Sequence, residues 1–144
     1  MAAKTGTQGA GCVFCAIAQG TGAAQRVFED AGVVAFLDRT PLFHGHVLVI
    51  PKVHVVTLPE LAGQAVEPLF AAVQKLAEAV PRAMGAQGSF VAMNNVVSQS
   101  VPHLHVHVVP RTKGDGLRGF FWPRQKYEDE AAMQAVGDRI RAAL

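Results

Sequence analysis

The chain lacks several features that would assign it to a common class. Its 144 residues contain no internal repeat, so we expect a single domain that is long enough to bury a core. Half of the residues are apolar, but the unbroken apolar runs are short, which argues against a membrane span. Residues 1–11 lack the apolar core of a secretion signal, and we interpret them as a flexible leader before a domain at 12–144, in a cytoplasmic protein.

Basic charge and cysteine are also scarce. The net charge is +2 at pH 7 without a basic run, so no nucleic-acid polymer is expected as a partner, and an anionic substrate must be recognised locally. The two cysteines, Cys12 and Cys15, form one C-x-x-C motif, and without a secretion signal we do not expect a disulfide. A thioredoxin-like redox pair would open a helix after a strand, whereas this pair precedes every element that we predict. Half of a zinc site is the better interpretation, and it needs two further ligands.

Histidine is concentrated instead, and residues 103–109 read H-L-H-V-H-V-V. In an extended strand successive side chains alternate between faces, so His103, His105 and His107 project from one face, roughly 6–7 Å apart. The apolar residues between them project from the other face, as in a strand half-buried against a core. Two chemistries fit: three ligands for one zinc, iron or copper ion, or a histidine nucleophile with hydrogen-bonding and acid–base neighbours. The spacing alone does not separate them.

The remaining pattern predicts strands around one long helix. Strands are expected at 26–30 and 33–38, joined at Ala31-Gly32, and then at 45–52, 90–94 and 103–111. A helix over 66–84 has one apolar face, with Pro68 in its first turn, and Pro81 should end or kink it. A last helix from about residue 128 should bury four apolar residues: Met133, Val136, Ile140 and Leu144. This succession indicates an α+β domain with an antiparallel sheet.

The six histidines occur in two groups. His44, His46 and His54 surround the strand at 45–52, and the other three occupy the strand at 103–111. Histidines with no shared role would be scattered along the chain. If these two strands share a sheet, the two groups meet, and the sequence predicts an active site or a metal site there.

These motifs resemble the histidine-triad superfamily of nucleotide hydrolases and transferases. The resemblance rests on H-L-H-V-H-V-V after Q-S-V, on G-H-V-L-V-I-P-K-V-H from residue 45, and on C-V-F-C-A-I from residue 12. It extends over about residues 12–111, and Trp122-Pro123 is similar to the nucleotide-binding branch of the family. The resemblance implies a homodimer in which each subunit contributes a five-stranded antiparallel sheet and a long helix.

For activity, the resemblance implies that His105 attacks the α-phosphorus of an AMP-type purine nucleotide. A neutral imidazole with a pKa near ~6.5 is an available nucleophile at neutral pH, and a nucleotidyl-histidine intermediate divides one hard step into two. His107 and His46 would donate to the phosphate and fix tautomers, and no catalytic metal is implied. Ser100 and Gln99 would lie beside the leaving group and the phosphate oxygens. Further matches to the nucleotide pocket of the family are Phe14, Ile17, Phe36, Leu37 and Asn94, with Asp38 as the acceptor for the ribose hydroxyls.

A subset of the family, largely bacterial, binds a structural zinc ion. The ligand pattern of that subset matches four residues here: Cys12, Cys15, His54 and His103. This set supplies the two ligands that the C-x-x-C motif needs, and it leaves His105 and His107 for chemistry.

Two departures from the family pattern concern the leaving group. The glycine-rich loop of the family is shortened to N-V-V-S at 95–98, and the tail at 113–127 is unlike most members. Arg118 and Arg124 in that tail either line a partner's pocket or are exposed. Four functions compete: a nucleoside phosphoramidase, a diadenosine polyphosphate hydrolase, a nucleotide-binding regulator with little catalysis, and a metal oxygenase or isomerase. The last would use three triad histidines as ligands and leave the C-x-x-C motif without a role. The sequence does not choose between adenine and guanine.

Overall fold

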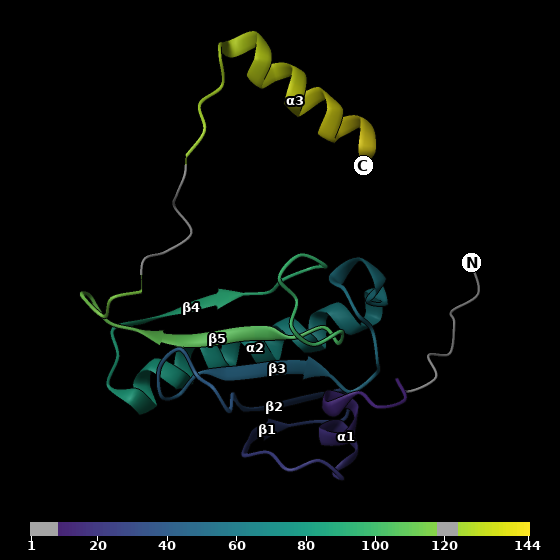
Figure 1. Cartoon of the computed structure of the whole chain (residues 1–144), viewed down its shortest axis with the longest axis vertical. Helices are drawn as coiled ribbons and strands as arrows, with labels where there is room; N and C mark the ends of the chain where they lie inside the picture. Colours follow the sequence, from purple (N-terminus) through teal and green to yellow (C-terminus); the bar gives the residue numbers. More distant parts are fainter. Residues whose placement is uncertain (1–8, 118–123) are drawn as a thin grey trace.

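The sheet is the part of the fold that positions the site. The computed structural model describes residues 9–117 and 124–144 (Figure 1). Its five strands are all antiparallel and lie in the order β1-β2-β3-β5-β4. They are β1 (Arg26–Glu29), β2 (Val33–Leu37), β3 (Val47–Pro51), β4 (Gly88–Ala92) and β5 (Val106–Arg111). The predicted α+β class with a five-stranded antiparallel sheet is confirmed.

The two faces of the sheet are covered unequally. The long helix α2 (Gly63–Met84) packs on one face, and the short helix α1 (Val13–Gln19) covers part of the other through Phe14 and Ile17 (Figure 1). The central strand β3 is therefore buried along its whole length. The predicted hairpin joins β1 to β2, and Asp30 closes it by accepting at Oδ1 from the amides two and three residues later.

Helix α2 extends past both expected proline boundaries. It begins at Gly63, before the predicted start at 66, so Pro68 lies inside the helix and not in its first turn. It also continues through Pro81 to Met84, and Gly85 follows with a φ of 64°. Each proline removes a backbone hydrogen bond, but the helix buries five apolar side chains: Leu69, Ala72, Val73, Leu76 and Val80. Tertiary packing thus overrides the local cost of the prolines.

Two local predictions near the histidines are wrong. The C-x-x-C motif does not precede every element, because Cys12 is the N-cap of α1 and its sulfur accepts from the amide of Cys15 at 3.4 Å. A helix of seven residues is too short for hydrophobic periodicity to predict it. In addition, β5 begins at Val106, so His103 and His105 lie in the segment that enters the strand. The apolar residues of this stretch are buried as predicted: Leu104, Val106 and Val108.

The C-terminal helix does not bury the face that we predicted. In α3 (Glu130–Ala143) the side chains of Met133 and Ile140 are 53% and 59% exposed, Leu144 is fully exposed, and Val136 is half-buried. Figure 1 draws this helix apart from the sheet. An apolar stripe identifies one face of a helix but not the surface that it packs against, which is the reason for the error.

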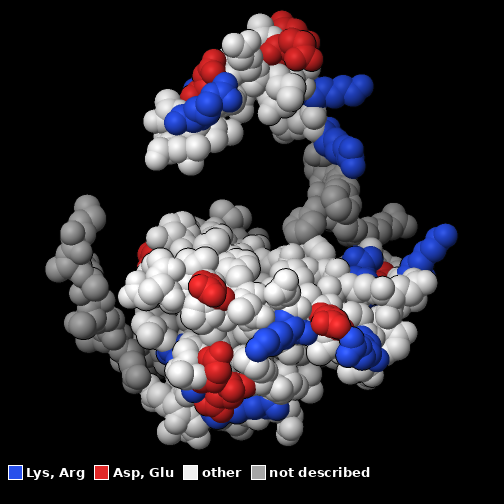
Figure 2. Space-filling model, turned by 180° about the vertical axis from the view of Figure 1, so that it is seen from behind, with Lys and Arg blue, Asp and Glu red and all other residues white. Residues whose placement is uncertain are grey.

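Several residues that the sequence analysis singled out lie outside the described residues or on the surface. Residues 1–8 of the expected leader, Arg118 and Trp122-Pro123 lie outside the described residues, and Arg124 is exposed. Basic and acidic side chains are interspersed on the face shown in Figure 2. Among the ion pairs of the described residues, Lys52 pairs with Glu29 at 2.7 Å. Within residues 9–117 and 124–144, no helix is both long enough and apolar enough to cross a membrane.

Candidate active site and metal site

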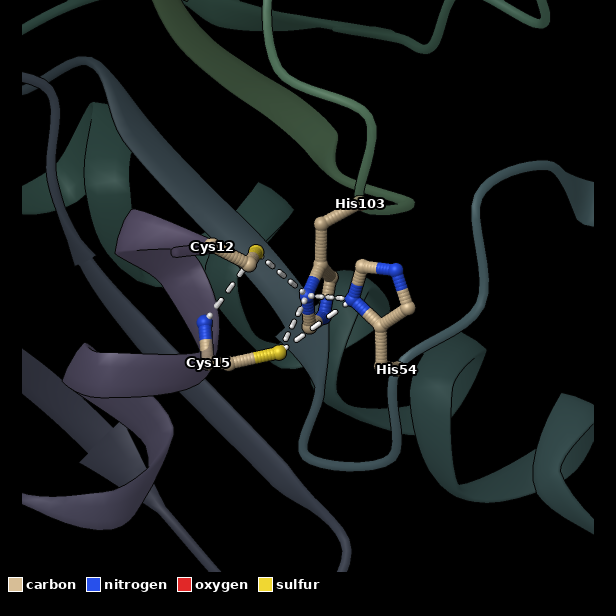
Figure 3. Close-up of side chains that lie close together, drawn as sticks. All are labelled: Cys12, Cys15, His54 and His103. Atoms are coloured by element: carbon tan, nitrogen blue, oxygen red, sulfur yellow. Dashed lines mark hydrogen bonds between the residues drawn. The ribbon is translucent and has the colours of Figure 1, made fainter. Parts of the chain in front are cut away.

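Four side chains with metal-binding atoms converge beside the sheet (Figure 3). They are Cys12 and Cys15 at the start of α1, His54 in the loop after β3, and His103 in the segment before β5. Their ligand atoms all lie within 4.8 Å of one another. The structure therefore brings together the four residues that the sequence suggested as zinc ligands.

The distances in this cluster suit a tetrahedral zinc ion. Nδ1 of His54 lies 3.3 Å from Nδ1 of His103, and the sulfurs of Cys12 and Cys15 each lie 3.5 Å from the same His103 atom. Tetrahedral bonds of about 2.05 Å to nitrogen and about 2.3 Å to sulfur would give separations of about 3.3 Å and 3.6 Å. Burial raises the pKa of the Cys15 thiol, and a bound cation would offset that effect by favouring the thiolate. The residues present fit the metal.

The tautomer of His103 also suits this role. Its Nε2–H donates to the carbonyl of Pro51 at 2.8 Å, so Nδ1 presents a lone pair to the cluster. His103 groups with the two cysteines and His54, and not with the other two triad histidines. The three triad histidines therefore do not form one ligand set.

Hydrogen bonds fix the tautomers of the remaining histidines. Nδ1–H of His105 donates to the carbonyl of His103 at 2.7 Å, which leaves Nε2 of His105 with a free lone pair. Nδ1 of His46 accepts from the amide of Leu42 at 3.1 Å, so its proton is on Nε2, which lies 2.9 Å from Nδ1 of His107. Nδ1 of His107 accepts the hydrogen bond from this N–H group of His46, so the proton of His107 is on its Nε2. The site thus places the free ring nitrogen of His105 beside the N–H donor of His107, with ring centroids 5.0 Å apart.

Burial keeps the hydrogen-bonded pair His46 and His107 neutral. It lowers the pKa of His107 to about 4, and the nearby His105 and His46 act in the same direction. Burial also lowers the pKa of His46. The carboxylate of Asp38 opposes both shifts, and its Oδ2 lies 3.7 Å from Nε2 of His46. At neutral pH without a ligand, the pair therefore acts as a chain of neutral imidazoles.

A cavity of about 850 Å³ opens in front of these histidines. That volume is in the range of small-molecule sites, whose walls are mostly apolar with a few polar groups. Eight residues that the sequence assigned to the nucleotide line it: Phe14, Ile17, Phe36, Leu37, Asp38, Ser100, His105 and His107. Phe14 also packs edge-on against the ring of His105, with centroids 5.2 Å apart. Helix α1 therefore contributes both to the metal cluster and to the wall of the cavity.

Three of the expected site residues do not line this cavity. His46 lies behind His107, as the hydrogen bond between them requires. Gln99 donates to the carbonyl of Val56 at 2.6 Å, and Asn94 donates to the carbonyl of Ser98 at 3.1 Å. The side chains of Gln99 and Asn94 thus hold the shortened loop in place. In that loop Val96 and Ser98 have positive φ angles of 71° and 61°, a conformation that is costly for a β-branched residue.

The cavity also includes polar residues that sequence reasoning missed. Gln25, Arg39 and Thr40 line its edge. Thr40 donates to Oδ1 of Asp38 through its amide at 2.9 Å and its hydroxyl at 3.4 Å. The sequence signal for Thr40 was its position two residues after a strand-ending aspartate, where a side chain commonly closes a turn. Gln25 carries no comparable signal.

Relatives with known names cover most of this chain. A HIT-like protein of Mycobacterium tuberculosis is 40% identical over 138 residues, which are 92% of each chain. The adenosine 5′-monophosphoramidase of Schizosaccharomyces pombe is 32% identical over 92% of this chain and 98% of that protein. An adenylylsulfatase of Arabidopsis thaliana is 35% identical over 74% of this chain, but the match spans only 55% of that longer protein.

Solved structures agree with the sequence comparison. A HIT family protein from Bacillus subtilis has a TM-score of 0.86 and 34% identity, over 93% of this chain and 97% of that chain. A zinc-bound histidine triad family protein from Mycobacterium smegmatis has a TM-score of 0.71 and 35% identity, over 94% of this chain and 99% of that chain. The HIT domain profile matches residues 19–114, and with these relatives it establishes that the chain belongs to the HIT family.

Proposed function

We propose that this protein hydrolyses a purine nucleotide at its α-phosphate, breaking a P–N or P–O bond through a nucleotidyl-His105 intermediate. The observation that carries the proposal is the tautomer of His105, whose Nδ1–H is held by the His103 carbonyl so that Nε2 is free beside the cavity. Attack by Nε2 on phosphorus expels the leaving group. Water then attacks the same phosphorus, releases the nucleoside monophosphate and restores the histidine.

The walls of the cavity suggest how the nucleotide binds. The base would lie against the apolar residues Phe14, Phe36 and Leu37. The ribose hydroxyls would donate to Asp38, because an ionised carboxylate accepts strong hydrogen bonds. Nε2–H of His107 and the hydroxyl of Ser100 would donate to phosphate oxygens. Gln99 and Asn94 would act on the nucleotide only through the loop that they hold.

An adenylyl substrate is favoured over the alternatives. The names of two relatives, an adenosine 5′-monophosphoramidase and an adenylylsulfatase, support an adenosine 5′-phosphoryl group with a removable partner. A diadenosine polyphosphate is the second candidate, since the shortened loop leaves Val96 and Val97 more than 70% exposed on the leaving-group side. A purely regulatory binding protein is disfavoured because the tautomers of His105 and His107 are set for chemistry.

We further propose a structural zinc ion at Cys12, Cys15, His54 and His103, a single domain over 12–144, and a homodimer. The fit of the ligand distances supports the zinc ion, and the exposed edge strand β4 supports pairing between subunits. When bound, zinc would hold the first turn of α1 against the segment before β5, while the reaction itself uses imidazole nitrogens and needs no metal. Thiolate ligands suit a reducing compartment such as the cytoplasm.

The proposed function is tested with a panel of substrates. Purified protein would be incubated with adenosine 5′-phosphoramidate, adenylyl sulfate, a diadenosine polyphosphate and the guanosine counterparts, and nucleoside monophosphate release would be followed by chromatography. We expect the highest kcat/KM for an adenylyl compound with a single leaving group. No turnover of any compound, with tight binding of AMP, would instead support a regulatory protein.

A further inference from the structure

We propose that the metal cluster controls the affinity of the nucleotide cavity, because the short helix α1 belongs to both sites. Zinc and nucleotide then bind cooperatively, since each favours the position of α1 that the other needs. The inference rests on the zinc site and the nucleotide cavity of the proposed function. It concerns binding, and it leaves the chemical step at His105 unchanged.

Helix α1 takes part in two sites at once. Its start carries Cys12 and Cys15, whose sulfurs point toward His54 and His103 (Figure 3). Four residues of the same helix line the nucleotide cavity: Val13, Phe14, Ala16 and Ile17. Phe14 lies between the two cysteines in the sequence, so a movement of the first turn of α1 moves the ring of Phe14 as well.

The ring of Phe14 packs between the two sites. Its centroid lies 6.0 Å from that of His103, which belongs to the cluster, and 5.2 Å from that of His105, which lines the cavity. The ring also meets Phe36 edge-on, with centroids 5.4 Å apart. Phe14 is only 6% exposed, so its close-packed ring follows the helix that carries it.

The histidine half of the cluster is held by hydrogen bonds of its own. Nε2–H of His103 donates to the carbonyl of Pro51 at 2.8 Å, and the amide of Leu104 donates to the carbonyl of Val55 at 2.7 Å. The second bond joins the segment before β5 to the loop after β3. The carbonyl of His103 in turn accepts from Nδ1–H of His105 at 2.7 Å. Removal of the metal should therefore leave His105 in place.

The cysteine half depends more strongly on a bound ion. Helix α1 has seven residues, and isolated helices shorter than about 12 residues are marginal in water. The side chain of Arg26 holds its C-terminal end by donating to the carbonyl of Ile17. At its start, the sulfurs of Cys12 and Cys15 lie 3.2 to 3.5 Å from imidazole nitrogens. A thiol is a weak donor, whereas coordination to one ion would fix both cysteines and, with them, the cavity wall.

Cooperative binding follows from this shared helix. A ligand that binds better to the ordered helix shifts the population toward it, and a second ligand that needs the same state then binds more tightly. The factor is the same in both directions. Coupling between two sites is typically about 5- to 150-fold, so removal of zinc should raise Kd for AMP by at least about fivefold. Saturating AMP should lower Kd for zinc by the same factor.

The test measures AMP binding by calorimetry in zinc-loaded and chelated wild type, at a temperature at which circular dichroism shows both to be folded. Zinc affinity is measured by competition with a chromophoric chelator, with and without saturating AMP. Phe14→Leu and Phe36→Leu form a matched pair, because both rings line the cavity but Phe14 belongs to α1 and Phe36 to β2. Both changes should weaken AMP binding, and only Phe14→Leu should also reduce the coupling factor.

Hydrogen exchange shows where the protein responds. On removal of zinc the amides of α1 should exchange faster while those of the buried strand β3 stay protected, and AMP should restore part of the protection in α1. Equal affinity for AMP with and without zinc would overturn the proposal. Exchange that rises equally in α1 and β3 would overturn it too, because the metal would then act on the whole fold.

Turnover separates this inference from the proposed function. With adenosine 5′-phosphoramidate, kcat should be similar with and without zinc while KM rises, since the carbonyl of His103 still holds His105. If AMP and zinc show the coupling but no nucleotide is hydrolysed, the proposed hydrolysis fails and the coupling stands. A lower kcat with an unchanged KM in the chelated protein would place the effect on His105 and contradict the inference.

Discussion

Replacing one predicted zinc ligand should lower stability far more than it lowers chemistry. In Cys15→Ser the metal loses a thiolate from a cluster whose atoms are spaced for tetrahedral coordination. A ligand that binds only the folded state stabilises it by RT ln(1 + [L]/Kd), which is about 4 kcal/mol at a thousandfold excess over Kd. His105 and His107 are untouched, so turnover measured below the shifted melting transition should persist.

The size of the effect follows from the length of the domain. At about 3–4 °C per kcal/mol for a chain of this size, Tm should fall by about 12–16 °C. Differential scanning calorimetry would be run on wild type, Cys15→Ser and the control His44→Ala, which alters an exposed histidine outside the cluster. Elemental analysis should give about one zinc per subunit in wild type and in His44→Ala, and much less in Cys15→Ser.

A chelator provides an independent control of the same argument. Stripping wild type with a strong chelator should lower its Tm to that of Cys15→Ser, and should leave the variant unchanged. Wild type that contains no metal after purification in zinc-supplemented medium, yet keeps its full stability when the chelator is added, would refute the structural role of the cluster.

Three other predictions concern the loop, the histidine pair and the sugar. Val96→Gly should raise the free energy of unfolding by about 0.5–1 kcal/mol in urea denaturation, because Val96 has a φ of 71°. The control Val97→Gly should not raise it, and equal effects of the two changes would argue against backbone strain. Burial lowers the pKa of His107 to about 4, from about 6.5 in the unfolded chain, so stability should be lost as pH falls between 6.5 and 4. His107→Asn should reduce that slope, and an identical slope would contradict the burial argument. Asp38→Ala should weaken AMP binding by roughly 1.5–3 kcal/mol in calorimetry and should abolish discrimination against 2′-deoxy-AMP. Equal discrimination by wild type and Asp38→Ala would mean that other residues hold the sugar.

The sequence predicted the parts of this molecule that depend on regular patterns. Alternation of histidine with apolar residues predicted the buried apolar side chains Leu104, Val106 and Val108 and the closeness of His105 to His107. The C-x-x-C motif and two distant histidines suggested the metal cluster because the resemblance supplied the pairing. Local chemistry at Ala31-Gly32 predicted the first hairpin.

The errors came from features that a local pattern does not contain. Helix α1 is too short to show a period, and α2 tolerates Pro81 because its apolar face packs on the sheet. The apolar face of α3 is exposed because periodicity does not name a partner surface. The contact between Asp38 and His46 joins the end of one strand to the start of the next, and only the register of β2 with β3 brings them together.

The measurement that tests the central claim most directly is a rapid-quench experiment on His105. Wild type would be mixed with excess adenosine 5′-phosphoramidate, quenched in base and analysed by intact mass and peptide mapping. We predict an adenylyl adduct on His105 that forms before AMP is released, no adduct in His105→Ala, and AMP affinity in that variant within about threefold of wild type, since the pocket is retained. Substantial turnover by His105→Ala, or an adduct on another residue, would contradict the account.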